Sequence, residues 1–164
     1  GIIAGDFEEE LSEVLTAEEL AEAKALLSHV SVVKEGVAAG KLGTHGMHDV
    51  TEGGVLGAVW EMCHIAGLGA EIWEREIPLH PVTVKISEHF GINPLRLISS
   101  GCMLIMVSPE RREAVMAGIR DAGVEVSCIG RVCESFTGLR LMDENGMISE
   151  ITPPEPDELY KVVK

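Results

Sequence analysis

His48-Asp49-Val50-Thr51-Glu52-Gly53-Gly54 is the stretch that decides the fold, because it joins a predicted strand to a predicted helix. The strand is expected over residues 44–50. The helix is expected over 53–66, where apolar residues recur at helical spacing and Gly67 can end it. Thr51 is predicted to cap the helix, and the paired glycines allow a backbone or a ligand to approach its positive end. The stretch therefore predicts an α/β protein with a potential anion site.

The second half of the chain repeats this order of elements. A buried strand is predicted over 102–107, a helix over 109–122 and a strand over 124–132. Asn145-Gly146 indicates a hairpin turn. The other predicted elements are a strand over 1–4, helices that begin after Asp6 and Thr16, a helix over 31–37 that ends by Gly40 or Gly43, a strand over 70–73, a helix over 81–89 and hairpin strands over 139–142 and 147–151. This order predicts a mixed sheet with helices on its faces, partly similar to a split β-α-β layout.

Length and composition are consistent with one domain. The chain has 164 residues, of which 46% are hydrophobic and only 4% aromatic, so its core is built mainly from aliphatic side chains. The formal net charge of −14 excludes a general nucleic-acid-binding surface, although a small nucleotide can be held by backbone N–H groups and a metal. We expect residues 1–30 to form a strand and helices, 31–151 the core, and 152–164 a tail that leaves the sheet.

Cysteine usage predicts a reducing compartment. The cysteines lie in apolar or alternating segments without a tight pairing motif, as is typical of reduced, buried thiols (Cys63, Cys102, Cys128 and Cys133). No apolar run approaches the roughly 20 residues that cross a bilayer, and no signal peptide is visible. We therefore expect a cytoplasmic protein without a membrane partner. Because the first residue is Gly1 rather than Met, we also expect a piece of a longer protein.

His48 and Asp49 are the candidate catalytic residues. Asp49 can orient a metal-bound phosphate or a reacting group, and His48 can carry a proton, since imidazole changes its charge near neutral pH. A purely structural interpretation stays open, in which Thr51 only caps the helix and Asp49 pairs with local N–H groups. The spacing of His45 and His48 is compatible with metal ligation. Cys63 falls on the apolar helix face as a core residue would, and we assign no metal site.

The sequence resembles the aminoimidazole ribonucleotide synthetase (AIR synthase, PurM) superfamily. HDVTEGG followed by VLGAVWEM is similar to the HD-x-T-x-GG segment of that superfamily. The similarity continues through GLGAEIWEREIPLHP, FGINPLRLISSGCMLIMV and VEVSCIGRV, so that it covers roughly residues 31–132. It is greatest to the HypE-like hydrogenase maturation proteins and the AIR synthase-related proteins.

The resemblance implies a PurM-like C-terminal domain with a three-layer α/β/α fold, a mixed sheet and partial likeness to ferredoxin-like folds. In that superfamily an N-terminal domain, expected to be absent from this chain, supplies most of the ATP and magnesium site. The protein is usually a homodimer, and the C-terminal domain closes over the site. Members use ATP to activate a carbonyl or amide oxygen or to phosphorylate a substrate.

The resemblance also implies which residues contact the nucleotide. Residues that match the family segment would face the phosphates or the acceptor (Asp49, Thr51, Gly53 and Gly54). Ser99, Ser100 and Gly101 form a second turn, which either offers donors to a phosphate or is a plain strand-entry turn.

The sequence departs from the HypE pattern at several positions. Val50 and Glu52 stand where that pattern has Pro and Arg, and Ser100 stands where it has an acidic residue. The chain also lacks the C-terminal cysteine that carries the carbamoyl group in HypE, because no cysteine follows Cys133. We therefore do not expect cyanide-precursor chemistry on this chain itself.

Three functions stay open from the sequence. The first is an ATP-dependent enzyme that acts on a small-molecule or protein-amide substrate with Mg²⁺. The second is a catalytically silent maturation or assembly factor that binds a partner protein. The third is a small-molecule kinase of the same superfamily.

Overall fold

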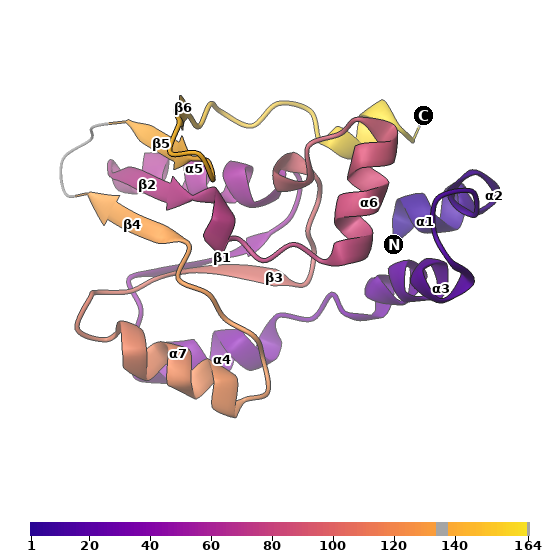
Figure 1. Ribbon diagram of the computed structural model, residues 1–164. Helices are drawn as coiled ribbons and strands as arrows, with labels where there is room; N and C mark the ends of the chain where they lie inside the picture. Colours follow the sequence, from indigo (N-terminus) through magenta and orange to yellow (C-terminus); the bar gives the residue numbers. More distant parts are fainter. Residues whose placement is uncertain (134–137, 164) are drawn as a thin grey trace.

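The computed structural model describes residues 1–133 and 138–163 (Figure 1). The helices are α1 (Ile2–Asp6), α2 (Glu8–Leu11), α3 (Ala17–Ala25), α4 (Val33–Leu42), α5 (Gly54–Ala66), α6 (Pro81–Phe90) and α7 (Arg112–Asp121). The strands are β1 (Gly46–Val50), β2 (Gly69–Trp73), β3 (Cys102–Met106), β4 (Gly130–Cys133), β5 (Leu139–Met142) and β6 (Ile148–Glu150). Short 3-10 helices are η1 (Leu26–Ser28), η2 (Glu74–Glu76), η3 (Pro94–Arg96) and η4 (Glu158–Lys161).

The strands form two sheets in the part of the chain that the structure describes. β1 and β3 pair antiparallel. The second sheet has the order β4-β2-β5-β6, in which β2 and β5 are parallel and the other neighbours antiparallel. The predicted α/β class with a mixed sheet is confirmed, with the difference that β1 and β3 form a ladder of their own. Side chains of α5 join both sheets, because Leu56 and Val59 belong to one buried cluster with Leu104 of β3 and Ile72 of β2.

The β1–β3 ladder is the middle of three layers. Successive side chains of a strand point to opposite faces. Leu104 and Met106 of β3 therefore pack in the cluster of α5, whereas Ile105 packs with Ala39 of α4 and Ile119 of α7. Figure 1 shows α5 on one side of the ladder and α4 with α7 on the other.

Residues 1–30 contain α1, α2, α3 and η1 and no strand, so the strand predicted over 1–4 is wrong. α1 occupies this segment, and Ile3, Ala4 and Leu11 are buried against Val82 and Ile86 of α6. A run of four apolar residues is compatible with either a helix or a strand. The helix satisfies its own backbone hydrogen bonds, whereas a strand needs a neighbour to do so.

The predicted ends of several helices are confirmed, and some starts are not. Gly43, Gly67 and Gly91 follow the last residues of α4, α5 and α6. Thr16 caps α3, since its hydroxyl accepts the Glu19 N–H at 3.2 Å and the Glu19 carboxylate accepts the Thr16 N–H at 3.0 Å. Asp6 does not cap α2, whose N-cap is Phe7, and the helices predicted from 31 and 109 begin later, at Val33 and Arg112.

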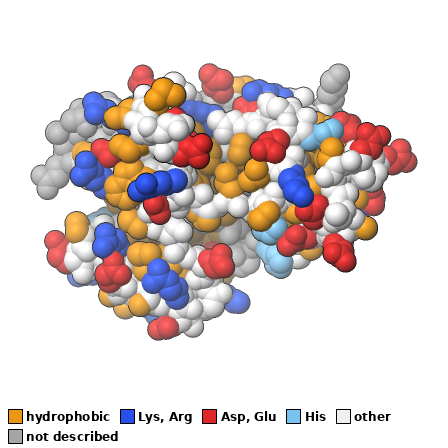
Figure 2. Space-filling view, viewed as in Figure 1, with side chains coloured by type: hydrophobic (Ala, Val, Ile, Leu, Met, Phe, Trp, Pro, Cys, Tyr) orange, Lys and Arg blue, Asp and Glu red, His pale blue; other side chains and the backbone are white. Residues whose placement is uncertain are grey.

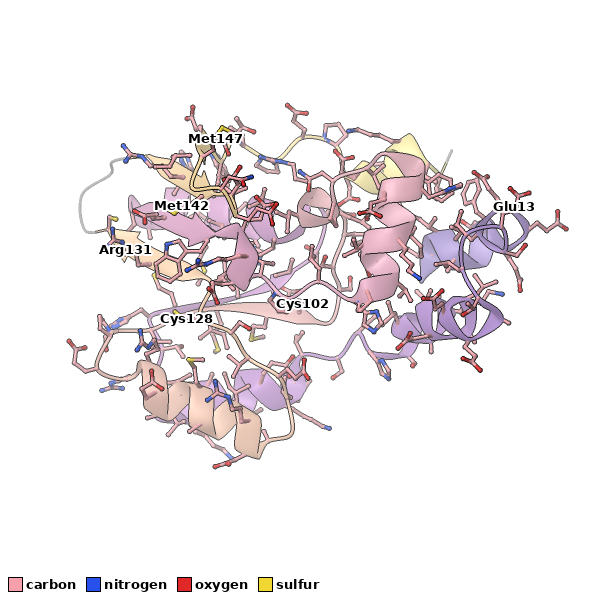
Figure 3. The ribbon with its side chains drawn as sticks, in the orientation of Figure 1. Glu13, Cys102, Cys128, Arg131, Met142 and Met147 are labelled. Atoms are coloured by element: carbon pink, nitrogen blue, oxygen red, sulfur yellow. The ribbon has the colours of Figure 1, made fainter. Side chains whose placement is uncertain are left out.

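The C-terminal half contains one shortened strand and one confirmed hairpin. The strand predicted over 124–132 is reduced to β4, because Val124 and Val126 pack against the α4–α7 cluster before the chain reaches the sheet. β5 and β6 form the predicted antiparallel hairpin, and Met142 and Met147 lie on either side of its turn (Figure 3). The Asp143 carboxylate stabilises this turn by accepting the N–H groups of Asn145 and Met147 at 2.9 and 2.8 Å.

Two isoleucines offer a test of the layered core. Ile119 is 2% exposed on the α4–α7 side of the ladder, whereas Ile65 near the end of α5 is 84% exposed. We expect Ile119→Ala to lower the free energy of unfolding by about 2–5 kcal/mol, because it leaves a cavity. Ile65→Ala is expected to change it by less than about 0.5 kcal/mol. Urea denaturation of both variants measures the difference, and equal losses would contradict this packing.

Candidate functional site

The two turns singled out in the sequence lie at the same end of the β1–β3 ladder. Val50, the last residue of β1, is opposite Cys102, the first residue of β3. In an antiparallel pair, the residues that follow one strand lie beside those that precede its partner. The turns at 51–54 and 99–101 therefore leave the ladder together.

The start of α5 differs from the prediction in one respect. Thr51 does not cap the helix with its side chain; Gly53 is the N-cap residue, in the left-handed region with φ 79°. The Thr51 carbonyl accepts the Gly54 N–H at 3.1 Å. Gly54 also has a positive φ of 62°, and a Cβ there would lie 2.5 Å from the Leu95 carbonyl oxygen and 2.8 Å from that of Leu97. The second glycine is thus required by the close approach of η3.

The Gly53 N–H already has an anionic partner within the chain. It donates to the Asp157 carboxylate over 2.7 Å in a buried hydrogen bond. Pro154 covers the same turn, since a Cβ on Gly53 would lie 3.3 Å from the Pro154 Cβ. A carboxylate is favoured there because the helix N-terminus presents unpaired N–H groups and a positive dipole end. At the helix start where the sequence predicted a potential anion site, the Gly53 N–H is bound by the Asp157 carboxylate of the same chain.

His48 and Asp49 point to opposite faces of β1. The His48 Nδ1 lies 2.6 Å from the Asp49 carbonyl oxygen, and its Nε2 lies 3.0 Å from the Glu61 carboxylate of α5. A carbonyl oxygen only accepts, so Nδ1 donates, and the ring is held at both nitrogens. Asp49 is exposed on the other face of β1, where it is the cross-strand partner of Met103. The two candidate catalytic side chains therefore do not act on the same atom from these positions.

The Ser99–Ser100–Gly101 turn leaves one hydroxyl open. The Ser99 hydroxyl donates to the Leu97 carbonyl oxygen at 2.9 Å, whereas Ser100 is exposed. Gly101 has φ 101°, and a Cβ there would clash with the His29 carbonyl. The turn is packed against the segment ahead of α4, and Ser100 is its residue available to a ligand.

Sequence reasoning missed two buried acidic residues next to these turns. Asp157 and Glu158 are 4% and 8% exposed, although residues 152–164 were predicted to be a tail. The tail does leave the sheet, but it returns to the start of α5. The local signal was an aspartate at a possible helix start, because Asp157 caps η4 by accepting the Leu159 N–H at 2.8 Å.

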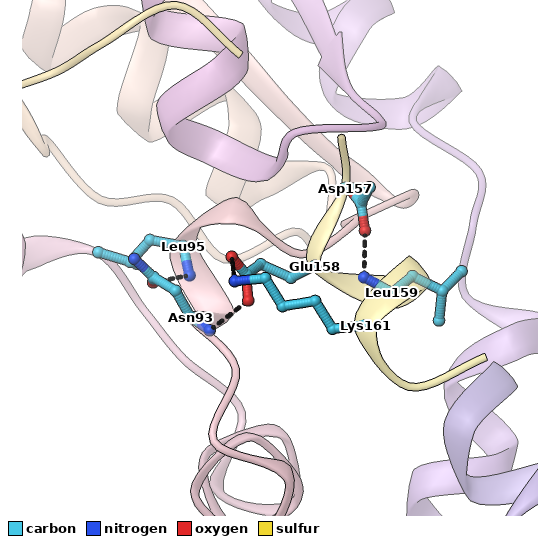
Figure 4. Close-up of polar contacts among 6 residues, drawn as sticks. All are labelled: Asn93, Leu95, Asp157, Glu158, Leu159 and Lys161. Atoms are coloured by element: carbon cyan, nitrogen blue, oxygen red, sulfur yellow. Dashed lines mark hydrogen bonds and ion pairs between the residues drawn. The ribbon is translucent and has the colours of Figure 1, made fainter. Parts of the chain in front are cut away.

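The Glu158 carboxylate is stabilised in its charged form. Burial raises its pKa, but the Lys161 ammonium at 2.6 Å and the Asn93 N–H at 3.1 Å outweigh burial and leave the pKa below its usual value (Figure 4). A lowered folded-state pKa gives stability that is present above the unfolded value, about 4.3. That contribution is lost as the pH falls through the folded-state pKa.

Other candidate groups do not assemble into a site. Within residues 1–133 and 138–163, no group of three or more His, Cys, Asp or Glu side chains is placed to hold a metal ion. Burial and the nearby Cys133 raise the pKa of the Cys63 thiol. Cys102 is exposed rather than buried as predicted; it lies on β3, whereas Cys128 lies ahead of β4 (Figure 3).

Acidic side chains are numerous at one end of the face that Figure 2 shows. Figure 2 shows acidic side chains gathered over the α1–α2 end of the molecule. The acidic residues 8–10 are exposed there. In the described part of the chain, no helix is both long and apolar enough to span a bilayer.

The fold and the paired turns define a PurM-like C-terminal domain. Residues 3–140 match the family described as AIR synthase related protein, C-terminal domain. The chain belongs to this family, and the resemblance drawn from the sequence is confirmed.

Similar proteins include several HypE proteins. Carbamoyl dehydratase HypE of Rhizobium leguminosarum bv. viciae is 32% identical over 124 residues, which cover 68% of this chain and 35% of that protein. The crystal structure of HypE from E. coli superimposes with a TM-score of 0.65 at 29% identity, over 73% of this chain and 38% of that one. A structure of hydrogenase maturation protein HypE in complex with ATP has a TM-score of 0.64 at 21% identity, over 70% of this chain and 37% of that one, which shows the shared fold. The chain spans about a third of the length of these relatives.

Two glycines test the close approach at the start of α5. Gly54 and Gly67 have nearly the same positive φ, 62° and 65°, but a Cβ on Gly67 would meet open space. We expect Gly67→Ala to cost about 1–2 kcal/mol of unfolding free energy from backbone strain. Gly54→Ala is expected to cost about 1–3 kcal/mol more, because its Cβ meets backbone oxygens. Denaturant titration compares the pair, and an equal cost at both sites would show that η3 does not press on Gly54.

Proposed function

We propose that this chain is the C-terminal domain of a HypE-like, ATP-dependent enzyme that activates a carbonyl or amide oxygen. The observation that carries the proposal is the family match over residues 3–140. Relatives named carbamoyl dehydratase HypE and a HypE structure in complex with ATP support this reaction class. Because the chain spans about a third of those proteins, most of the nucleotide site is proposed to lie in an N-terminal domain.

The proposed role of this domain is to close over that site with the end of the β1–β3 ladder. Asp49 and Ser100 are exposed there, and Thr51 is half-buried at the start of the 51–54 turn. A carboxylate and two hydroxyls are suitable groups to orient an acceptor or a phosphate. Gly53 and Gly54 remain part of the proposed contact through the shape of the turn, since the Gly53 N–H is held by Asp157.

The chemistry of the donor set fits a partial contribution to a magnesium site. Mg²⁺ is commonly bound through one or two carboxylates together with substrate phosphates. Asp49 offers one exposed carboxylate, and the remaining ligands are proposed to come from the nucleotide and the N-terminal domain. A homodimer and a small-molecule or protein-amide substrate complete the proposal.

Full-length protein provides the test. We expect it to hydrolyse ATP, and Asp49→Asn to lower kcat/KM by about tenfold or more, because a charged contact to the reacting groups is removed. Asp121→Asn is the matched control: Asp121 is also an exposed aspartate, but it ends α7 away from the turns. Release of inorganic phosphate is measured at ATP concentrations well below saturation, which gives kcat/KM, and at saturation, which gives kcat.

The same assay separates the alternatives. Absence of ATP binding by the full-length protein would contradict the proposal and favour a partner-binding maturation factor. Unchanged binding and turnover in Asp49→Asn would remove Asp49 from the site. Phosphate recovered on an acceptor rather than in solution would favour a kinase.

A further inference from the structure

The segment 152–163, here called the tail segment, contacts two parts of the chain that meet at the start of α5. One contact is with Gly53, and the others are with the 93–97 stretch, which contains η3 and packs against Gly54. The tail segment lies beyond residues 3–140, the part of the chain that matches the family. Its contacts are therefore a property of this chain that the family match does not supply.

Asp157 is the buried centre of these contacts. One carboxylate oxygen accepts the Gly53 N–H at 2.7 Å, and the other accepts the Leu159 N–H at 2.8 Å. A carboxylate at a helix N-terminus interacts with the positive end of the helix dipole. Asp157 is 4% exposed, and its hydrogen bond to Gly53 is buried, whereas the one to Leu159 is partly buried.

Neighbouring contacts join the tail segment to the 93–97 stretch. Glu158 accepts the Asn93 N–H at 3.1 Å, and its other oxygen pairs with Lys161 (Figure 4). Arg96 reaches the start of the segment, where its Nη2 donates to the Thr152 hydroxyl at 2.9 Å. Asn93 and Arg96 flank Leu95, whose carbonyl oxygen faces Gly54. The tail segment thus holds η3 and Gly53 at a set separation.

We propose that the tail segment is an intramolecular brace of the candidate site and that Asp157 is its positioning residue. Asp157 fixes the Gly53–Gly54 turn, and through it the direction in which the chain leaves β1 after Val50. It does so without contacting substrate. The consequence for turnover rests on the proposed function, whereas the consequence for local structure does not.

The packing favours a brace over an occupant that an incoming phosphate displaces. Pro154 lies against Gly53 and Gly57, so that the tail segment covers the turn closely. Leu159, Val162 and Val163 pack on the cluster formed by α1–α3 and α6. Expelling Asp157 would therefore also expose apolar surface that is buried beside the N-terminal helices.

Hydrogen–deuterium exchange tests the brace in the full-length protein. We compare Asp157→Ala with Asp143→Ala, because Asp143 also accepts two backbone N–H groups, at a distant hairpin turn. Asp157→Ala is expected to speed exchange of the Gly53 amide and of residues 93–97 by about tenfold to a hundredfold, the range for losing a hydrogen bond to a charged group. Asp143→Ala is expected to affect only residues 143–147. Unchanged exchange around Gly53 in a folded Asp157→Ala variant would overturn the brace.

Asp157→Asn covers the case in which the alanine variant does not fold. The amide retains one oxygen acceptor, so we expect a smaller increase in exchange at Gly53 than in the alanine variant. The same exchange measurement with added ATP or inorganic phosphate separates the brace from a displaceable occupant. Protection of the Leu159 amide is expected to persist, and its loss on addition of either anion would overturn the brace.

The rate of ATP hydrolysis is the last measurement. If the full-length protein hydrolyses ATP, Asp157→Ala is expected to lower kcat at least tenfold while its thermal midpoint stays close to that of Asp143→Ala. Wild-type kcat in the folded Asp157→Ala variant would overturn the positioning role. If the wild-type protein hydrolyses no ATP, the proposed function fails, and the exchange result still decides the brace.

Discussion

The antiparallel pairing of β1 with β3 is the constraint on which the rest of the structure depends. It places Val50 opposite Cys102, so that two turns from distant parts of the sequence leave the ladder together. The alternation of side chains along the same strands separates the α5 layer from the α4–α7 layer. The candidate site is therefore a product of strand register.

That register also explains why adjacent residues have different surroundings. His48 packs toward α5 and is bound by Glu61, whereas Asp49 is exposed on the other face. A catalytic pair built from neighbours on a strand needs a bulge or a bend to bring both side chains to one face. β1 pairs residue by residue with β3, so it keeps them apart.

The paired glycines show how steric demand and ligand binding can produce the same sequence signal. A glycine at a helix start is expected wherever a phosphate approaches the backbone. Here η3 approaches Gly54, and Pro154 with the Asp157 carboxylate approaches Gly53. The sequence indicated a helix start that a backbone or a ligand approaches closely, and in the structure the groups that approach it belong to the same chain.

The sequence by itself determined the elements whose signals are local. Helical spacing up to Gly67, the helix start after Thr16 and the Asn145-Gly146 turn each depend on neighbours in the chain, and the structure confirms them. The tertiary structure decided whether residues 1–4 were helix or strand, because an apolar run of that length fits both and the choice depended on packing against α6. It also decided the partner of the Gly53 N–H, since Asp157 lies 104 residues away and no local pattern links a helix start to a carboxylate at that separation.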